Sequence, residues 1–66
     1  MENRMRELRM KLGLTQCELA AMAGISRVTV NRVERGTHIP DGKTILRIAK
    51  ALGHPASQVF VALSAD

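Results

Sequence analysis

The sequence of 66 residues has few aromatic side chains and little cysteine. Phe60 is its one aromatic residue, so the aromatic platforms on which proteins stack the bases of single-stranded DNA or RNA are missing. Cys17 is its one cysteine and cannot form an internal disulfide. The chain has no secretory apolar segment and no membrane-spanning run of about 20 apolar residues, so we expect a cytoplasmic protein.

Catalytic and metal-binding patterns are also missing. The sequence contains no paired acid and base, no nucleophile beside a base and no glycine-rich phosphate loop. We therefore expect no enzymatic activity, no cofactor and no small-molecule ligand. His38 and His54 are far apart and have no thiol or carboxylate cluster around them, so we expect no metal site.

What the chain does have is positive charge. Its 10 Lys and Arg residues outnumber its 6 Asp and Glu residues, which gives a formal net charge of +4 and favours a polyanion as the partner. Because aromatic residues are so scarce, double-stranded DNA is a better candidate than RNA. A domain of this length has a small core, which argues against a deep enclosed active site.

Apolar residues that recur at three- and four-residue steps predict one all-α domain over residues 1–66, a compact bundle of five short helices. Thr15 and Glu18 form the pattern of a reciprocal capping box, Asp41 is an N-cap residue, and Pro55 suits a first helical position. The stripe predicted for the first helix consists of Met1, Met5, Leu8 and Leu12. The predicted helices cover about residues 2–12, 15–23, 26–35, 42–52 and 55–63.

The stretch SRVTVNRVERG, residues 26–36, contains β-branched residues that favour a strand. The alternating pattern of a strand fails, however, because Arg32 would share a face with Val30. A helix fits better, since Ser26 is an N-cap residue and Gly36 ends the stretch. As a helix, the stretch would point its later valines inward and its arginines and asparagine toward solvent.

The helix over 26–35 is the second of a pair, since it follows the helix over 15–23 after a glycine-containing turn. Such a helix suits the major groove of DNA, which is about 12 Å wide and admits one helix. Arginine can bind guanine O6 and N7 together, asparagine can bind adenine N6 and N7, and valine can contact a thymine methyl group. Taken alone, the arginines would be interpreted as a solvated helix surface.

The pattern LTQ-ELA--AGIS--TV-R-ERG is followed by a proline four residues after Gly36 and by a helix that ends in AKALG. It resembles the phage repressor and Cro-like helix-turn-helix regulators, also called the xenobiotic-response-element family, over nearly the whole chain. The resemblance implies a bundle of four or five helices in which the helix over 26–35 is the recognition helix. The base-contacting residues that it implies are Arg27, Val28, Asn31 and Arg32.

The resemblance also implies contacts to the DNA backbone and a structural ion pair. The residues expected at the backbone are Arg9, Gln16, Ser26, Thr29, Arg35, Thr37, His38 and Lys43. Gln16 is also expected to buttress the recognition helix. Arg9 and Glu34 occupy positions that often pair in similar proteins, and unpaired surface charge is the alternative.

The predicted function is a sequence-specific, double-stranded DNA-binding transcriptional regulator, and a repressor because 66 residues leave no room for an effector or activation domain. One recognition helix reads few base pairs, so we expect a homodimer on a palindromic operator. The interface is expected at an apolar ridge of Val59, Phe60 and Leu63, with closure of the monomer core by Phe60 as the alternative. The rival function is a protein-interaction module, such as an antitoxin or adaptor, that uses the helices over 42–52 and 55–63.

Overall fold

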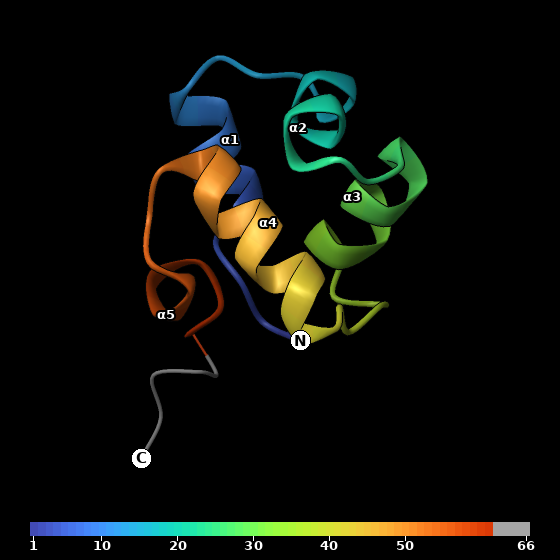
Figure 1. The fold of residues 1–66 in the computed structure, drawn as a ribbon, viewed down its shortest axis with the longest axis vertical. Helices are drawn as coiled ribbons and strands as arrows, with labels where there is room; N and C mark the ends of the chain where they lie inside the picture. Colours follow the sequence, from blue (N-terminus) through green and yellow to red (C-terminus); the bar gives the residue numbers. More distant parts are fainter. Residues whose placement is uncertain (62–66) are drawn as a thin grey trace.

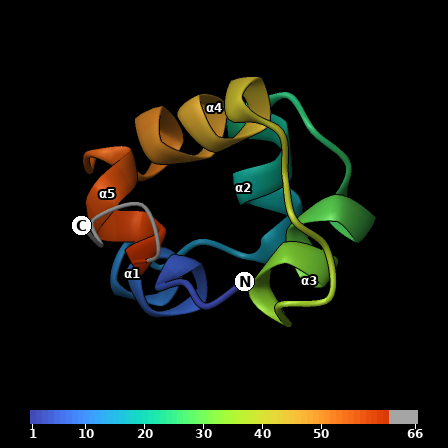
Figure 2. The same ribbon diagram turned by 90° about the horizontal axis from the view of Figure 1, so that it is seen from below.

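The computed structural model describes residues 1–61, which contain five helices and no strand. The helices are α1 (Met5–Lys11), α2 (Gln16–Ala23), α3 (Arg27–Glu34), α4 (Gly42–Leu52) and α5 (Ala56–Val59). In Figure 1, α4 runs across the middle of the view, with α1 and α5 to one side and α2 and α3 to the other, and Figure 2 shows that α4 lies along one edge of the molecule. The predicted all-α fold is confirmed. No helix in the described part of the chain is both long and apolar enough to be a membrane span.

Side-chain caps begin three of the helices. At α2, the Thr15 hydroxyl accepts the Glu18 amide at 3.0 Å and the Glu18 carboxylate accepts the Thr15 amide at 2.9 Å, so the predicted capping box is confirmed. At α3, the Ser26 hydroxyl accepts a first-turn amide at 3.0 Å. At α4, the Asp41 carboxylate accepts a first-turn amide at 2.8 Å. These local bonds determine where the three helices start.

One apolar core joins all the helices. Helix α4 supplies its centre, because it packs against α1, α2 and α5. Among residues 1–61, no buried side-chain nitrogen or oxygen lacks a hydrogen bond. The buried apolar residues are Met5, Leu8, Leu19, Ala20, Ala23, Val30, Val33, Ile48, Ala49, Leu52, Val59 and Phe60.

Helix α1 begins later than the predicted residue 2, and its buried stripe is shorter than predicted. The Asn3 side-chain oxygen accepts the Met5 amide at 3.0 Å, and the Arg4 amide donates to the Val59 carbonyl at 2.7 Å. These bonds hold Asn3 and Arg4 in a non-helical path, with the backbone of Arg4 against α5. Leu12 follows the last helical residue and is 53% exposed, so its predicted place in the stripe is wrong.

The C-terminal helix also differs from the prediction. Pro55 precedes the first helical residue instead of occupying it, and Phe60 leaves the helix with an extended backbone. Val59 and Phe60 are both 0% exposed, so the expected apolar ridge at these two residues is wrong and the alternative, closure of the monomer core by Phe60, is confirmed. A core this small has few large apolar side chains, and burying each contributes about 1.5 to 3 kcal/mol. The prediction for Leu63 lies outside the described residues.

Candidate functional site

A tight turn joins α2 to α3. Gly24 ends α2 with φ 69°, in the left-handed region that favours glycine, and the Ile25 amide reaches back to the Ala20 carbonyl at 3.0 Å. Ile25 is half-buried and packs against the core, and Ser26 then caps α3. The turn therefore has two anchors, one in the backbone and one in the core, and it holds two short helices in a helix-turn-helix arrangement.

The two sides of α3 differ as the sequence predicted. Val30 and Val33 are fully buried, whereas Arg27 and Arg32 are exposed and Val28 is 48% exposed. The fourth residue expected to contact bases, Asn31, is half-buried at the edge of this face. Within residues 1–61, neither of these two arginines forms an ion pair, so their guanidinium groups are available to an acceptor outside the protein.

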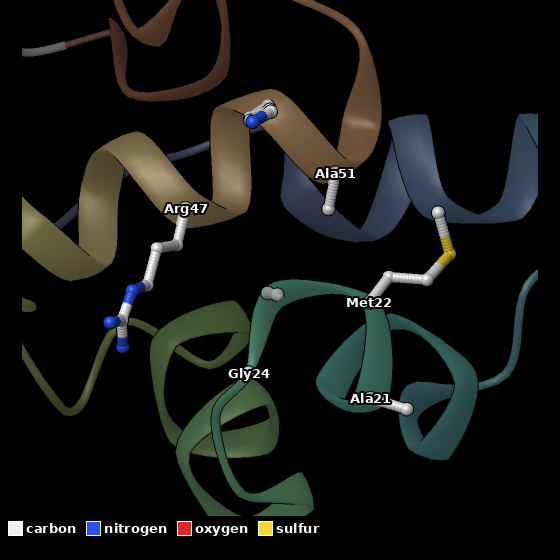
Figure 3. A pocket seen from close by; sticks show the side chains of 7 residues that line it. Ala21, Met22, Gly24, Arg47 and Ala51 are labelled. Carbon is white, nitrogen blue, oxygen red and sulfur yellow. The ribbon is translucent and has the colours of Figure 1, made fainter.

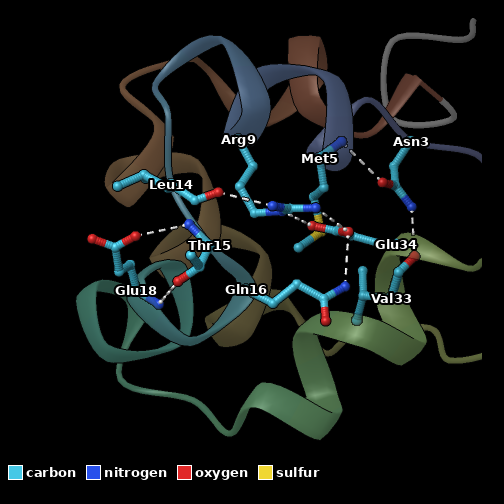
Figure 4. Close-up of polar contacts among 9 residues, drawn as sticks. All are labelled: Asn3, Met5, Arg9, Leu14, Thr15, Gln16, Glu18, Val33 and Glu34. Carbon is cyan, nitrogen blue, oxygen red and sulfur yellow. Dashed lines mark hydrogen bonds and ion pairs between the residues drawn. The ribbon is translucent and has the colours of Figure 1, made fainter.

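A polar junction, formed by Arg9, Gln16 and Glu34, joins three helices (Figure 4). Arg9 Nε and Nη2 donate to the two oxygens of Glu34 at 2.7 and 3.2 Å, and Gln16 Nε2 donates to Glu34 Oε1 at 3.1 Å. The Glu34 side chain is 4% exposed and that of Arg9 is 12% exposed. The predicted ion pair and the predicted support of α3 by Gln16 are both confirmed. Because charge-assisted bonds are directional, this junction holds α3 at one angle to α1 and α2.

The predicted contact between Arg9 and the DNA backbone stays a prediction. Its third side-chain nitrogen, Nη1, donates to the Leu14 carbonyl at 2.8 Å, so every side-chain nitrogen of Arg9 already has a partner inside the protein. The role that the structure shows for Arg9 is therefore structural.

A hollow of about 460 Å³ lies over the polar junction and beside α3. Arg6 and Arg35 are exposed at this hollow. Because Glu34 is already paired with Arg9, the hollow has a net positive charge. Arg6 was not predicted at this site from the sequence, although its position three residues before Arg9 places both side chains on one side of α1. The hollow is lined by Arg6, Arg9, Gln16, Asn31, Glu34 and Arg35.

The other residues predicted at the DNA backbone lie at the start of α3, in the loop between α3 and α4, and in the first turn of α4. The Ser26 and Thr29 hydroxyl oxygens are 2.8 Å apart and share a hydrogen bond, so one hydroxyl proton of this pair is already engaged. Thr37 lies three residues beyond α3 and caps its last turn, because its amide and hydroxyl both donate to the Arg32 carbonyl, at 3.0 and 3.2 Å. The remaining predicted backbone contacts lie between the end of α3 and the first turn of α4, and all of them are exposed: Arg35, His38 and Lys43.

A second hollow, of about 630 Å³, lies between α2 and α4 (Figure 3). Met22 on α2 is 56% exposed, and Arg47 and Lys50 on α4 line the hollow without an ion pair inside residues 1–61. Its other lining residues are Ala21, Ala23, Gly24 and Ala51. In the described part of the chain, no three His, Cys, Asp or Glu side chains come together as metal ligands.

Comparisons with known proteins agree with this geometry. A family model described as helix-turn-helix matches residues 5–57. An uncharacterized HTH-type transcriptional regulator of Bacillus subtilis, YgzD, is 35% identical over 60 residues, which are 91% of each chain. The crystal structure of the restriction-modification controller protein C.AhdI from Aeromonas hydrophila is similar with a TM-score of 0.82 and 40% identity, over 86% of both chains. The P22 c2 repressor protein, crystallised with a synthetic operator, is similar with a TM-score of 0.83 and 33% identity, also over 86% of both chains.

Proposed function

Because this chain belongs to the helix-turn-helix family, in the group of phage repressor and Cro-like regulators, we propose that it is a sequence-specific, double-stranded DNA-binding transcriptional regulator. The observation on which the proposal rests is the exposed face of α3, where Arg27 and Arg32 have no ion-pair partner within residues 1–61. The similarity to the P22 c2 repressor, crystallised with a synthetic operator, supports it.

In this proposal, α3 enters the major groove and its exposed face reads base edges. Arg27 and Arg32 bind guanine, Asn31 binds adenine, and Val28 contacts a thymine methyl group. The polar junction and the buried valines hold the helix in place, so these side chains meet the bases without reorganising the domain.

The surrounding polar residues bind phosphates. Phosphate contacts position a protein on the duplex but do not read its sequence. Arg35 and Lys43 supply positive charge, and Gln16, at the first position of α2, lies where backbone amides favour an anion. The remaining proposed phosphate contacts are Ser26, Thr29, Thr37 and His38.

The proposed regulator acts as a repressor and as a homodimer on a palindromic operator. One α3 reads too few base pairs to select a site in a genome, and two copies related by a two-fold axis would place their recognition helices about 34 Å apart, one turn of DNA. Similarity to a phage repressor supports the repressor role. Sedimentation of the protein alone and with an inverted repeat measures the dimer, and a reporter gene behind the selected operator separates repression from activation.

Selection of duplexes from a random pool tests DNA reading. Arg27→Ala and Arg32→Ala should each cost about 1 to 3 kcal/mol on the selected operator and relax its sequence preference. Lys50→Ala is the matched control, because it removes one positive charge from α4 instead of α3. If both α3 variants discriminate operator from scrambled DNA as well as the control does, α3 is not the recognition helix.

A titration over several salt concentrations tests the phosphate contacts. Lys43→Ala should weaken binding to operator and scrambled duplexes alike, and should reduce the slope of log affinity against log salt by about one. Gln16→Ala should weaken both duplexes without reducing the slope as much, because an amide carries no charge, and it should also lower the preference for the operator, because it removes the bond from Gln16 to Glu34. An unchanged slope for Lys43→Ala would exclude Lys43 from the phosphate contacts.

The rival function, a protein-interaction module, has one observation in its favour. Two apolar side chains are open to a partner, Met22 at the hollow between α2 and α4 (56% exposed) and Leu46 on α4 (66% exposed), whereas Val59 and Phe60 are buried and contribute none. Salt dependence separates the two functions, since phosphate binding weakens steeply with salt and apolar association does not.

A further inference from the structure

The side chain of Asn3 links the start of α1 to the end of α3 (Figure 4). Its Oδ1 accepts the Met5 amide at 3.0 Å, and its Nδ2 donates to the Val33 carbonyl at 2.8 Å. Nδ2 also donates to the Met1 carbonyl at 3.1 Å. Asn3 is half-buried, and the residue after it, Arg4, is held to α5 through its amide. Asn3 is therefore held by two bonds that do not involve α3, its own bond to Met5 and that of the neighbouring Arg4 to Val59, while the Met1 ammonium donates to the Gly36 carbonyl at 3.1 Å.

The Val33 carbonyl is one of the last carbonyls of α3, which have no partner inside the helix. The Gly36 amide also donates to it, at 3.0 Å. The next residue, Glu34, is held by the polar junction. Consecutive residues of α3 are thus bonded to α1 by two routes, the backbone of Val33 through Asn3 and the side chain of Glu34 through Arg9. Two attachments of this kind restrict both rotation of α3 about its axis and displacement of its C-terminal end.

We propose that Asn3 is a positioning residue for DNA reading. It acts through the Val33 carbonyl, and Arg32, which the proposed function assigns to a base, is the residue immediately before Val33. A recognition side chain works only when it is held within about 0.5 Å of its productive position, so losing the bond from Asn3 should reduce operator reading more than general DNA binding. This inference rests on the proposed function.

Asn3→Ser separates the bond that Asn3 accepts from Met5 from the two bonds that its Nδ2 donates, to Val33 and to Met1. A serine hydroxyl can still accept the Met5 amide in a local turn, but it is too short to reach the Val33 carbonyl. Asn3→Asp also keeps the acceptor for Met5, and it replaces the donor to Val33 with a second oxygen that repels the carbonyl. Ile48→Val, which removes one buried methylene from α4, is the control for lost stability alone, because it leaves every bond of Asn3 intact.

The experiment measures the dissociation constants of wild type and the three variants for the selected operator and for a scrambled duplex. The temperature is set where circular dichroism shows all four proteins folded. We expect Asn3→Ser and Asn3→Asp to weaken operator binding by about fivefold or more, in the range of a lost base contact, relative to their effect on the scrambled duplex. Ile48→Val should leave this ratio unchanged. In Asn3→Ser, exchange of the Gly36 amide with solvent should also speed up, because its acceptor is less firmly held.

The other possible outcomes contradict either the proposed function or the positioning role of Asn3. If wild type prefers no duplex in the selection, the proposed function fails and this inference fails with it. If wild type prefers its operator and Asn3→Ser keeps the same ratio, the inference alone is wrong. If Ile48→Val lowers the ratio as much as Asn3→Ser does, the effect comes from stability, and Asn3 has no positioning role.

Discussion

Two junctions in this domain make different contributions to its structure. The polar junction of Arg9, Gln16 and Glu34 consists of directional hydrogen bonds among α1, α2 and α3. The apolar junction, which we define as Val59 and Phe60 where they complete the core, has no side-chain cap at its helix and consists of buried apolar surface. Burial is non-directional and contributes mainly stability, whereas bonds to a buried carboxylate determine orientation. The comparison therefore predicts that damage to the two junctions has different consequences.

The largest effect should come from Phe60→Ala. Phe60 is fully buried, and truncating such a side chain costs about 3 to 5 kcal/mol. A domain of this size has a total stability of roughly 3 to 10 kcal/mol, so the variant should be partly unfolded at room temperature. Urea unfolding followed by circular dichroism measures this. Leu46→Ala, at a side chain that is 66% exposed, should change the unfolding free energy by less than about 0.5 kcal/mol.

The second effect concerns the polar junction. Glu34→Ala should cost about 3 kcal/mol, because it leaves the nearly buried charge of Arg9 without its partner. The double variant Arg9→Met with Glu34→Leu should regain much of that stability, since apolar residues of similar size can replace a buried ion pair. It should nevertheless lose preference for the selected operator, because the directional bonds are gone. A double variant that is both stable and fully selective would show that the junction has no part in orienting α3.

A smaller effect is expected at the start of α2. Thr15→Ala removes the hydroxyl that accepts the Glu18 amide and should cost about 1 kcal/mol. Thr15→Ser keeps the hydroxyl and should cost much less. Thermal unfolding of both variants beside wild type measures the difference, and equal melting temperatures for Ala and Ser would mean that the cap contributes nothing.

The smallest effect is a dependence on acid. The bond from the Thr15 amide lowers the pKa of the Glu18 carboxyl below its ordinary value of 4.5. A carboxyl whose pKa is lower in the folded state stabilises that state above the unfolded pKa, and this stabilisation is lost as the pH falls through the folded pKa. Between about pH 5 and pH 3, the unfolding free energy of Glu18→Gln should therefore fall less steeply than that of wild type. Parallel slopes would show that this bond is not linked to folding.

The two junctions also differ in how far the sequence predicted them. Thr15, Ser26 and Asp41 act on amides three residues away, so their patterns predicted the starts of α2, α3 and α4 closely. The pair of Arg9 and Glu34 joins residues far apart in the chain and was predicted only through the resemblance to a known family. An apolar residue near the end of a chain can close the core or face a partner, depending on the space that the other helices leave. Periodicity does not measure that space, so the predicted exposure of Phe60 was wrong.

Asn3 also makes a contact that the sequence did not predict, in addition to one that it did. Asparagine ahead of a helix is a local signal for a turn, and the bond to the Met5 amide fits that signal. Nothing near Asn3 in the sequence indicates that its amide meets the carbonyl of Val33, because that contact exists only after α1 and α3 have packed. The exposed face of α3 was predictable, and one of the bonds that hold this helix in place was not.

Because five helices share a single core, we expect that the helix-turn-helix segment does not fold on its own. Helices α2 and α3 have 8 residues each, below the roughly 12 to 15 at which an isolated helix becomes even marginally populated in water. A synthetic peptide spanning only these two helices should be a random coil with no affinity for an operator. In the intact domain, unfolding is cooperative, so DNA binding and helicity should disappear in the same thermal transition, and a protease that cuts the unfolded chain would end both at once.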